Sequence, residues 1–286
     1  MLLLVLICAS LLVGCAVAAA ARRYPQASPT GRPTIDLARE AGATAARHHW
    51  RRVIEARRHP GTATGLALTL AGMMIIAGTA VVGVLAYLVR SDSRLVELDN
   101  SLSHWADRNQ STFSADILDA VTRLGATSTV VVLAVVLLVV ETRRTRSPWI
   151  APFLVLVIAG NAILYTTIKD LVDRLRPALN PIAETLGPSY PSGHSATAAA
   201  FFAAAALLLG RGRGQQARAI LAGVAAGVAV AVAATRVLLD VHWLSDVIGG
   251  LALGWAWFAV CAIAFGGRLL RFGAAAESVG QASSRS

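Results

Sequence analysis

The stretch Pro191–Gly210 reads PSGHSATAAAFFAAAALLLG. A serine, a glycine and a histidine at its start lead directly into an apolar run without a charged side chain. Such a run is typical of a helix buried in a membrane. The residues in front of it leave backbone N–H groups free at the positive end of the helix dipole, where an anion can bind. The stretch therefore predicts a membrane helix over 195–210 with a polar site at its amino end.

The rest of the chain has the same apolar character. It has 286 residues, of which 56% are hydrophobic and 15% are charged, and this composition excludes an ordinary soluble domain. A helix needs roughly 20 apolar residues to cross a hydrocarbon core of about 30 Å. Further apolar runs lie at 2–21, 63–89, 126–140, 148–168, 219–235 and 247–266. We predict an all-α, polytopic transmembrane helical bundle, in which an additional N-terminal apolar helix precedes a core of six spans.

The net charge of +10 comes from arginines that cluster between the apolar runs. Because these arginines are not spread over one surface or interleaved with aromatic residues, they do not indicate a nucleic-acid partner. Counting alternate loops puts all the clusters on one side, which the positive-inside rule assigns to the cytoplasm. The clusters lie at 22–58, 143–146, 211–218 and 268–271. The segments 90–125, 169–194 and 236–246 are then extracytoplasmic.

The amino-terminal run 1–21 is followed, not preceded, by basic residues, which is the reverse of a signal peptide. We favour a retained transmembrane helix whose amino end is outside. The alternative is a bacterial lipoprotein, because LVGC at 12–15 resembles a cleavage box that would leave Cys15 lipidated. Cys8, Cys15 and Cys261 all lie in apolar runs, so we expect no disulfide framework.

The remaining segments divide the chain further. Residues 22–62 are interpreted as a basic cytoplasmic linker, with an amphipathic helix on anionic lipid as the alternative. Residues 63–271 form the membrane domain, and 272–286 are small and polar, which is typical of a disordered tail. In 90–125 the apolar residues have helical spacing, which predicts one or two short amphipathic helices. Glycines four apart, at 223 and 227 and at 250 and 254, indicate close helix packing.

A second polar motif, KDLVDRLRP, spans 169–177 and holds Lys169, the single lysine among 26 basic residues. Lys169 and Arg176 are seven apart, so a continuing helix would project both from one face as a cationic clamp, and Pro177 would end that helix. The alternative is that Lys169 pairs with Asp173 while Arg174 and Arg176 meet lipid headgroups.

The third motif holds Arg236, His242 and Asp246. His242 and Asp246 are four apart, so we expect them on one helical face, with the carboxylate accepting a hydrogen bond from one ring nitrogen. The other nitrogen is then free to act as nucleophile or base. Asp240 is interpreted as a loop residue or as a partner of Arg236.

Together these residues suit phosphoryl transfer. Positive charges and donors would surround the phosphoryl oxygens; they are Lys169, Arg176, Arg236, the Ser192 hydroxyl and the Gly193 amide. His242 would attack phosphorus, Asp246 would stabilise its imidazolium form, and His194 would protonate the departing oxygen and then activate water. We expect no cofactor and no metal, and disfavour a zinc-bound water because the histidines lack suitable cysteine or carboxylate companions.

The three motifs resemble the signature of the type-2 phosphatidic-acid phosphatase superfamily, and the resemblance covers roughly 90–270. In that signature six residues separate a lysine from Arg-Pro, Pro-Ser-Gly-His follows, and Ser-Arg precedes a histidine and an aspartate. Only Thr235, in place of the serine, departs from it. The resemblance implies a six-span bundle that hydrolyses a lipid phosphate or polyprenyl diphosphate at the outer face of the cell membrane.

Other functions stay open beside this one. Vanadium haloperoxidases share the motifs, but they are soluble and this chain spans a membrane. A phosphotransferase would need the same residues, and phosphatidic acid or phosphatidylglycerol phosphate could be the substrate. A non-catalytic lipid-binding or transport protein is disfavoured because both histidines and Asp246 are present. Polyprenyl diphosphate ranks slightly first, by analogy alone.

Overall fold

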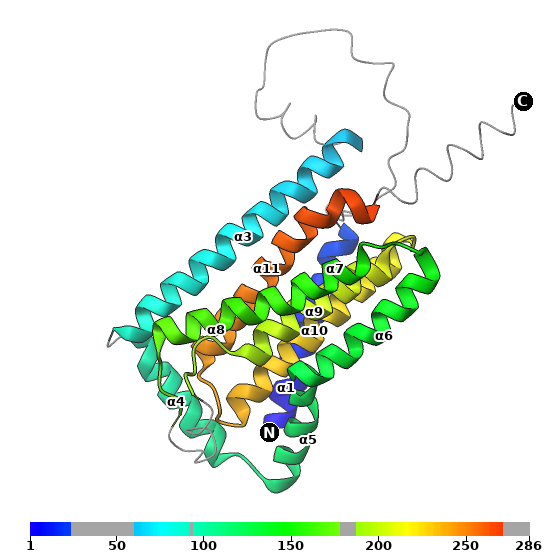
Figure 1. Ribbon diagram of the computed structural model, residues 1–286. Helices are drawn as coiled ribbons and strands as arrows, with labels where there is room; N and C mark the ends of the chain where they lie inside the picture. The colour runs from blue at the N-terminus through cyan, green and yellow to red at the C-terminus, as the bar shows by residue number, and fades with distance from the viewer. Residues whose placement is uncertain (24–59, 92–93, 178–186, 271–286) are drawn as a thin grey trace, which may run out of the picture.

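The computed structural model describes residues 1–23, 60–91, 94–177 and 187–270, and every regular element in these ranges is a helix (Figure 1). Most of the predicted linker and the whole predicted tail lie outside these residues. The helices are α1 (Leu2–Arg23), α3 (Pro60–Arg90), α4 (Arg94–Arg108), α5 (Thr112–Thr122), η2 (Arg123–Gly125), α6 (Thr127–Thr145), α7 (Ile150–Val155), η3 (Leu156–Gly160), α8 (Asn161–Val172), α9 (Gly193–Gly210), α10 (Gln215–Leu238) and α11 (Leu244–Leu270).

Six helical segments among the described residues are long and apolar enough to cross a membrane, and α1 is one of them. The others are α3, the continuous α7–η3–α8, α9, α10 and α11. The run expected at 126–140 is the exception. It forms α6, which qualifies only together with α5 and η2, across a bend of 53°. The predicted all-α membrane bundle with an extra N-terminal helix is confirmed.

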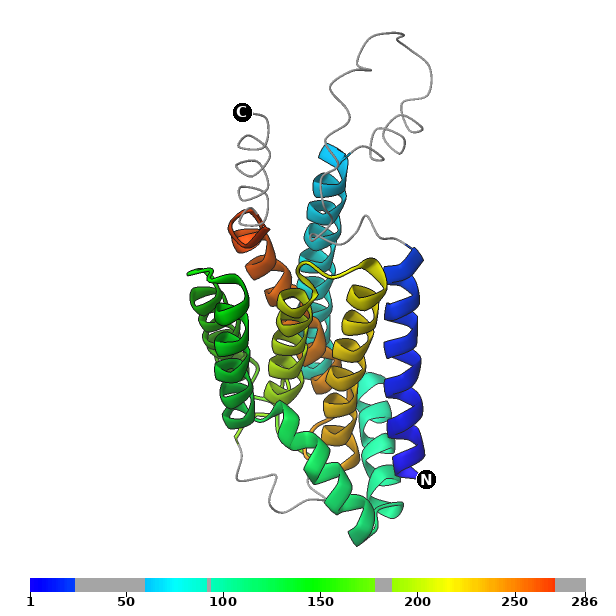
Figure 2. The same cartoon turned by 90° about the vertical axis from the view of Figure 1, so that its right-hand side faces the viewer.

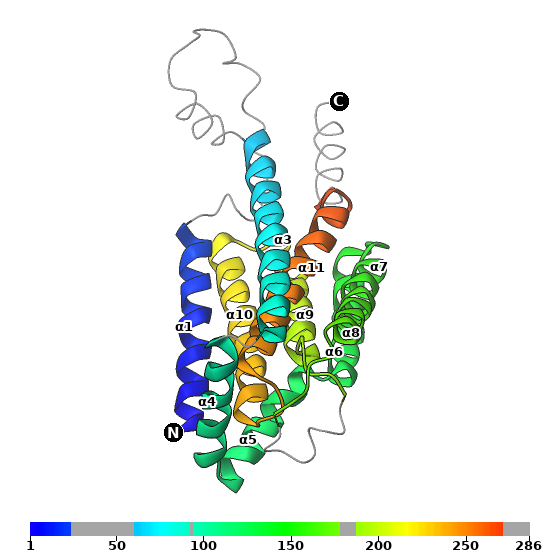
Figure 3. The ribbon, with the colours of Figure 1, turned by 90° about the vertical axis from the view of Figure 1, so that its left-hand side faces the viewer.

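Small residues let the central helices approach closely. Figures 2 and 3 show α1 beside α10, and α3 running along α11. A Cβ atom added to Gly14 of α1 would lie 2.9 Å from the Gly223 carbonyl oxygen of α10. One added to Gly250 of α11 would lie 2.5 Å from the Ser192 carbonyl oxygen, just before α9. The glycines therefore serve packing, as predicted, and one of them fixes the start of α9 against α11.

Three arginine-rich segments meet at one end of the bundle. Gln215 donates to the Arg22 carbonyl over 2.6 Å, and Arg144 donates to the Arg211 carbonyl. The fully buried Glu141 forms ion pairs with Arg144 at 2.7 Å and with Arg211 at 3.0 Å. In Figure 1 the helices α4 and α5 lie at the opposite end, together with the amino terminus. The charge clusters and the polar motifs are thus separated along the bundle.

The segment 94–122 forms two short helices, as its apolar spacing predicts. The helix α5 begins with a capping box in which Ser111 and Ser114 exchange hydrogen bonds. Its Leu118 joins a buried cluster with Leu2 and Leu6 of α1 and Leu238 of α10. The N-terminal helix is therefore packed against the end of the bundle that carries the polar motifs.

Candidate active site

The motif KDLVDRLRP at 169–177 is not a helix throughout, and the prediction that its helix continues to Pro177 is wrong. The helix ends at Val172, and Asp173 adopts a left-handed conformation with φ 47°. The chain beyond it pairs with residues just before α9. Ser189 N–H donates to the Arg174 carbonyl over 2.8 Å, and Ser189 Oγ donates to the Leu175 carbonyl over 3.1 Å. These contacts replace the hydrogen bonds that another helical turn would have made.

Lys169 and Arg176 nevertheless converge, because both donate to the Pro188 carbonyl. Lys169 Nζ also reaches the Ser189 carbonyl at 3.3 Å, and Arg176 Nε reaches the Gly187 carbonyl at 2.8 Å. No ion pair joins Lys169 to Asp173 in the described part of the chain. The two cations therefore meet at one carbonyl, and the loop after α8 brings them together instead of a continuing helix.

Ser192 and Gly193 place the start of α9 at the same point. Ser192 is the N-cap, and its hydroxyl oxygen accepts hydrogen bonds from Ser195 N–H and Ser195 Oγ. Its backbone N–H donates to the Asp246 carbonyl over 2.9 Å, which ties α9 to α11. A Cβ atom at Gly193 would lie 3.2 Å from the Tyr165 ring, so glycine leaves the first amides of the helix uncrowded on that side.

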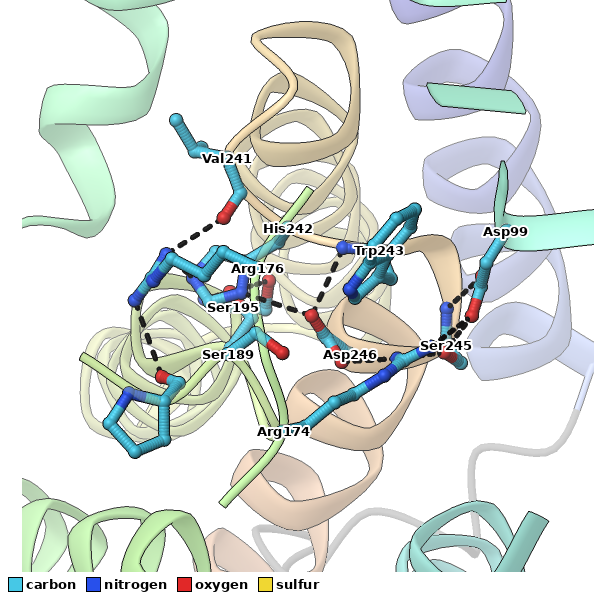
Figure 4. A network of polar contacts seen from close by, with 12 residues as sticks. Asp99, Arg174, Arg176, Ser189, Ser195, Val241, His242, Trp243, Ser245 and Asp246 are labelled. Carbon is cyan, nitrogen blue, oxygen red and sulfur yellow. Dashed lines mark hydrogen bonds and ion pairs between the residues drawn. The ribbon is translucent and has the colours of Figure 1, made fainter. Parts of the chain in front are cut away.

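His242 and Asp246 contact each other as predicted, with His242 Nδ1 3.3 Å from Asp246 Oδ2 (Figure 4). They do not share a helical face, because α11 begins at Leu244 and His242 lies in the preceding turn. Two other hydrogen bonds fix this turn. Trp243 N–H donates to Asp246 Oδ2 over 3.0 Å, and His242 N–H donates to the Arg236 carbonyl over 3.1 Å. The carboxylate therefore caps α11 and orients the imidazole at once.

The environment of His242 keeps its ring neutral. The residue is 3% exposed, and burial lowers its pKa to about 3 against the opposing effect of Asp246. Arg176 and Arg236 lower the pKa further. With Nδ1–H donating to Asp246, Nε2 carries the lone pair and accepts from Arg176 Nη1 at 3.1 Å. A neutral ring whose Nε2 carries the lone pair is the form that a nucleophile requires.

Arg236 and His194 complete the group. Arg236 Nη1 donates to Thr122 Oγ1 over 3.2 Å, while its buried Nε has no hydrogen-bond partner among the described residues. Arg176, Arg236 and Lys169 all lie near enough to His194 for their charges to act on it.

Asp240 accepts a hydrogen bond from Ser103, so it is the predicted loop residue. No ion pair joins Asp240 to Arg236 in the described ranges.

Arg174 and Asp99 belong to this site, although neither was predicted as a site residue. Arg174 does not face lipid headgroups: its side chain is 10% exposed and forms ion pairs with Asp246 at 2.7 Å and Asp99 at 2.8 Å. Its guanidinium also lies 5.3 Å from the centre of the Trp243 ring. The sequence held one indication of Asp99: it lies among the apolar residues of α4, so it is expected to be buried. A buried carboxylate needs a partner.

The site contains cations, hydroxyls and imidazoles. Among the described residues, no three or more histidine, cysteine, aspartate or glutamate side chains are placed to hold a metal ion. The eight predicted site residues gather around the loop 174–177, the start of α9 and the turn before α11.

Comparison with known proteins places this arrangement in a family. The PAP2 superfamily matches residues 149–269, which include all eight predicted site residues. Phosphatidylglycerophosphatase B of Bacillus subtilis (strain 168) is 31% identical over 144 residues, which are 49% of this chain and 69% of that protein. Lipid A 1-phosphatase of Rhizobium johnstonii is 36% identical over 122 residues, which are 39% of this chain and 46% of that protein.

A solved structure agrees with the sequence relatives. The crystal structure of a transmembrane PAP2 type phosphatidylglycerolphosphate phosphatase from Bacillus subtilis matches with a TM-score of 0.60 and 26% identity. The match covers 65% of this chain and 93% of that chain. Sequence and fold agree, and the chain belongs to the PAP2 superfamily.

Proposed function

We propose that this membrane lipid phosphatase acts at the extracytoplasmic face through a phosphohistidine intermediate on His242. One observation carries the proposed phosphohistidine mechanism. The buried, neutral imidazole has Nδ1 3.3 Å from the Asp246 carboxylate and Nε2 3.1 Å from the Arg176 guanidinium. The nucleophilic nitrogen thus faces a cation that can also bind a phosphoryl oxygen.

The proposed reaction has two steps. The Nε2 lone pair of His242 attacks phosphorus, the bond from phosphorus to the lipid oxygen breaks, and His194 gives its proton to that oxygen. Water then attacks phosphorus, His194 takes a proton from the water, and the phosphorus–nitrogen bond breaks. Asp246 stabilises the imidazolium charge that exists between the two steps.

Positive charge around the phosphoryl group supplies the electrostatic stabilisation. Lys169 and Arg176 converge on one point, the Pro188 carbonyl. Arg236 contributes a buried Nε–H that has no other acceptor among the described residues. Such a donor costs free energy until an acceptor arrives, which favours binding of an anion beside it. The Gly193 amide and the Ser192 hydroxyl lie at the positive end of α9 and add to the same field.

The proposed substrate is the phosphate of a lipid. The relatives described above are named as phosphatases of phosphatidylglycerophosphate and of lipid A. Phosphatidylglycerophosphate therefore comes first among the substrates to be tested, followed by phosphatidic acid and a polyprenyl diphosphate.

The experiment measures phosphate release from each lipid by the detergent-solubilised protein and by the variant His242→Asn. We expect release from at least one lipid and its loss in the variant. Wild-type rates in His242→Asn would refute the mechanism. Transfer of the phosphoryl group to a second lipid, and not to water, would indicate a phosphotransferase.

The face of action is proposed from charge. Arginine-rich ends of membrane proteins remain in the cytoplasm, and here the site lies at the other end of the bundle. Thr112 of α5 and Gln216 of α10 are exposed residues at the two ends. Each is replaced by cysteine in a chain whose three natural cysteines are alanine. In whole cells, a membrane-impermeant thiol reagent should label Thr112→Cys and spare Gln216→Cys. The reverse pattern would put the site in the cytoplasm.

A further inference from the structure

We propose that Asp99 of α4 is a positioning residue, which acts through Arg174 to hold the Asp246 carboxylate in place and in charge balance behind His242. The inference rests on the proposed nucleophilic role of His242 and adds a residue to it. Asp99 precedes the segment 149–269 that matches the family, and none of the three motifs contains it.

The contacts form a continuous buried chain, drawn in Figure 4. His242 contacts one oxygen of Asp246, and Arg174 Nη1 binds the other oxygen at 2.7 Å. Arg174 Nη2 then binds Asp99 Oδ2 at 2.8 Å. Asp99 also accepts from Ser245, from its backbone N–H over 3.1 Å and from its hydroxyl over 2.5 Å. Asp99 and Asp246 are each at most 1% exposed, so solvent screens these interactions weakly.

The charges of Asp99, Arg174 and Asp246 together favour a positively charged imidazole at His242. Two carboxylates face one guanidinium, so the group carries one net negative charge while His242 is neutral. When His242 becomes positively charged in the phosphoenzyme, that negative charge offsets it. If Asp99 were neutral, Arg174 would balance Asp246 by itself, and the imidazolium would lose this support.

The same helix holds the catalytic turn at a second point. Ser103 lies one helical turn after Asp99 and donates to Asp240, which is in the turn between α10 and α11. Asp99 and Ser103 are both buried, whereas Glu97 on the same helix is exposed. The face of α4 that carries Asp99 and Ser103 therefore braces the turn that carries His242, and Glu97 offers a matched carboxylate outside the contact.

The test compares Asp99→Asn with Glu97→Gln, since each removes one negative charge from α4 with little change of shape. The contacts of the side chain at position 99 go to Arg174 and Ser245, so we expect neither the carboxylate nor the amide that replaces it to touch the phosphoryl group. We therefore expect Asp99→Asn to lower kcat on the order of tenfold and to leave KM nearly unchanged. Losses of this size are typical when a residue orients a histidine without contacting the substrate itself. Glu97→Gln should match the wild type in both constants.

A second readout does not depend on turnover. In a histidine-labelled sample, NMR should show the His242 Nδ1–H proton displaced upfield in Asp99→Asn, because a carboxylate balanced by Arg174 is a weaker acceptor. Ser103→Ala removes the other brace and should lower the melting temperature without moving this resonance. If Asp99→Asn fails to fold, Arg174→Lys is the second variant, because lysine cannot bridge two carboxylates with a planar fork. It should also lower kcat and move the His242 resonance from its wild-type position, because Asp99 and Asp246 no longer share one guanidinium.

A folded Asp99→Asn protein in which either kcat or the His242 resonance keeps its wild-type value would overturn the proposal. Failure of the proposed function would appear differently, as full activity in His242→Asn. The two failures can therefore be told apart in one set of samples.

Discussion

Acid sensitivity of the fold is the sharpest prediction from the burial of His242. Burial lowers the pKa of this imidazole from 6.5 to about 3. The unfolded chain therefore binds a proton below pH 6.5 that the folded protein does not take up until near pH 3. Stability linked to His242 is fully present above pH 6.5 and is lost as the pH falls toward 3.

The size of the loss follows from the two pKa values. At pH 5.0 the unfolded imidazole is mostly protonated and the folded one is neutral, so the difference amounts to about 2 kcal/mol at 1.36 kcal/mol per pH unit. For a chain of this size, about 2–4 °C per kcal/mol translates this into roughly 4–8 °C in melting temperature.

The assay follows tryptophan fluorescence during heating at pH 7.5 and pH 5.0. The variant His242→Asn keeps a donor toward Asp246 but cannot titrate. Between pH 7.5 and pH 5.0 its melting temperature should therefore fall by roughly 4–8 °C less than that of the wild type. His104→Asn is the matched control, because His104 is exposed on α4 and its removal should leave the acid sensitivity unchanged. Equal losses in the wild type and in His242→Asn would refute the argument.

Three further predictions test other parts of the site. Lys169→Arg should lower kcat on the order of tenfold or more, because a planar fork crowds Arg176 around one phosphoryl group, and wild-type initial rates would contradict this. Gly250→Ala should reduce both activity and melting temperature, since its methyl group would meet the Ser192 carbonyl at 2.5 Å, whereas Gly72→Ala, with nothing within 4 Å, should be harmless in the same assays. Phosphate release should survive EDTA and be inhibited by vanadate, because cations and amides provide the electrostatics; a metal requirement restored by adding divalent ions would count against it.

The helices could be predicted from sequence because apolar run length determines them. The limits of the prediction appear where the chain leaves a helix. The prediction that one helix carries Lys169 and Arg176 brought the two side chains together on the wrong backbone. Asp173 adopts a left-handed conformation, and the next residues pair with Ser189. That pairing joins segments separated by a loop, which local periodicity does not report.

The same limit explains the residues that were missed. His242 and Asp246 could be paired from their spacing, because the contact is local. Asp99 reaches Asp246 through Arg174, and its contact with Ser245 spans 146 residues of sequence. Its position on the apolar face of α4 indicated burial, but only the fold identifies the partner.

The most direct test of the central claim is to trap phosphate on His242. In His194→Gln, radiolabelled p-nitrophenyl phosphate should still phosphorylate the protein, because nitrophenolate departs without a proton, while activation of water is lost. After an alkaline quench, which preserves phosphohistidine, peptide mapping should place the label on His242. Label on another residue, or steady nitrophenol release by His194→Gln with no labelled protein, would contradict the mechanism.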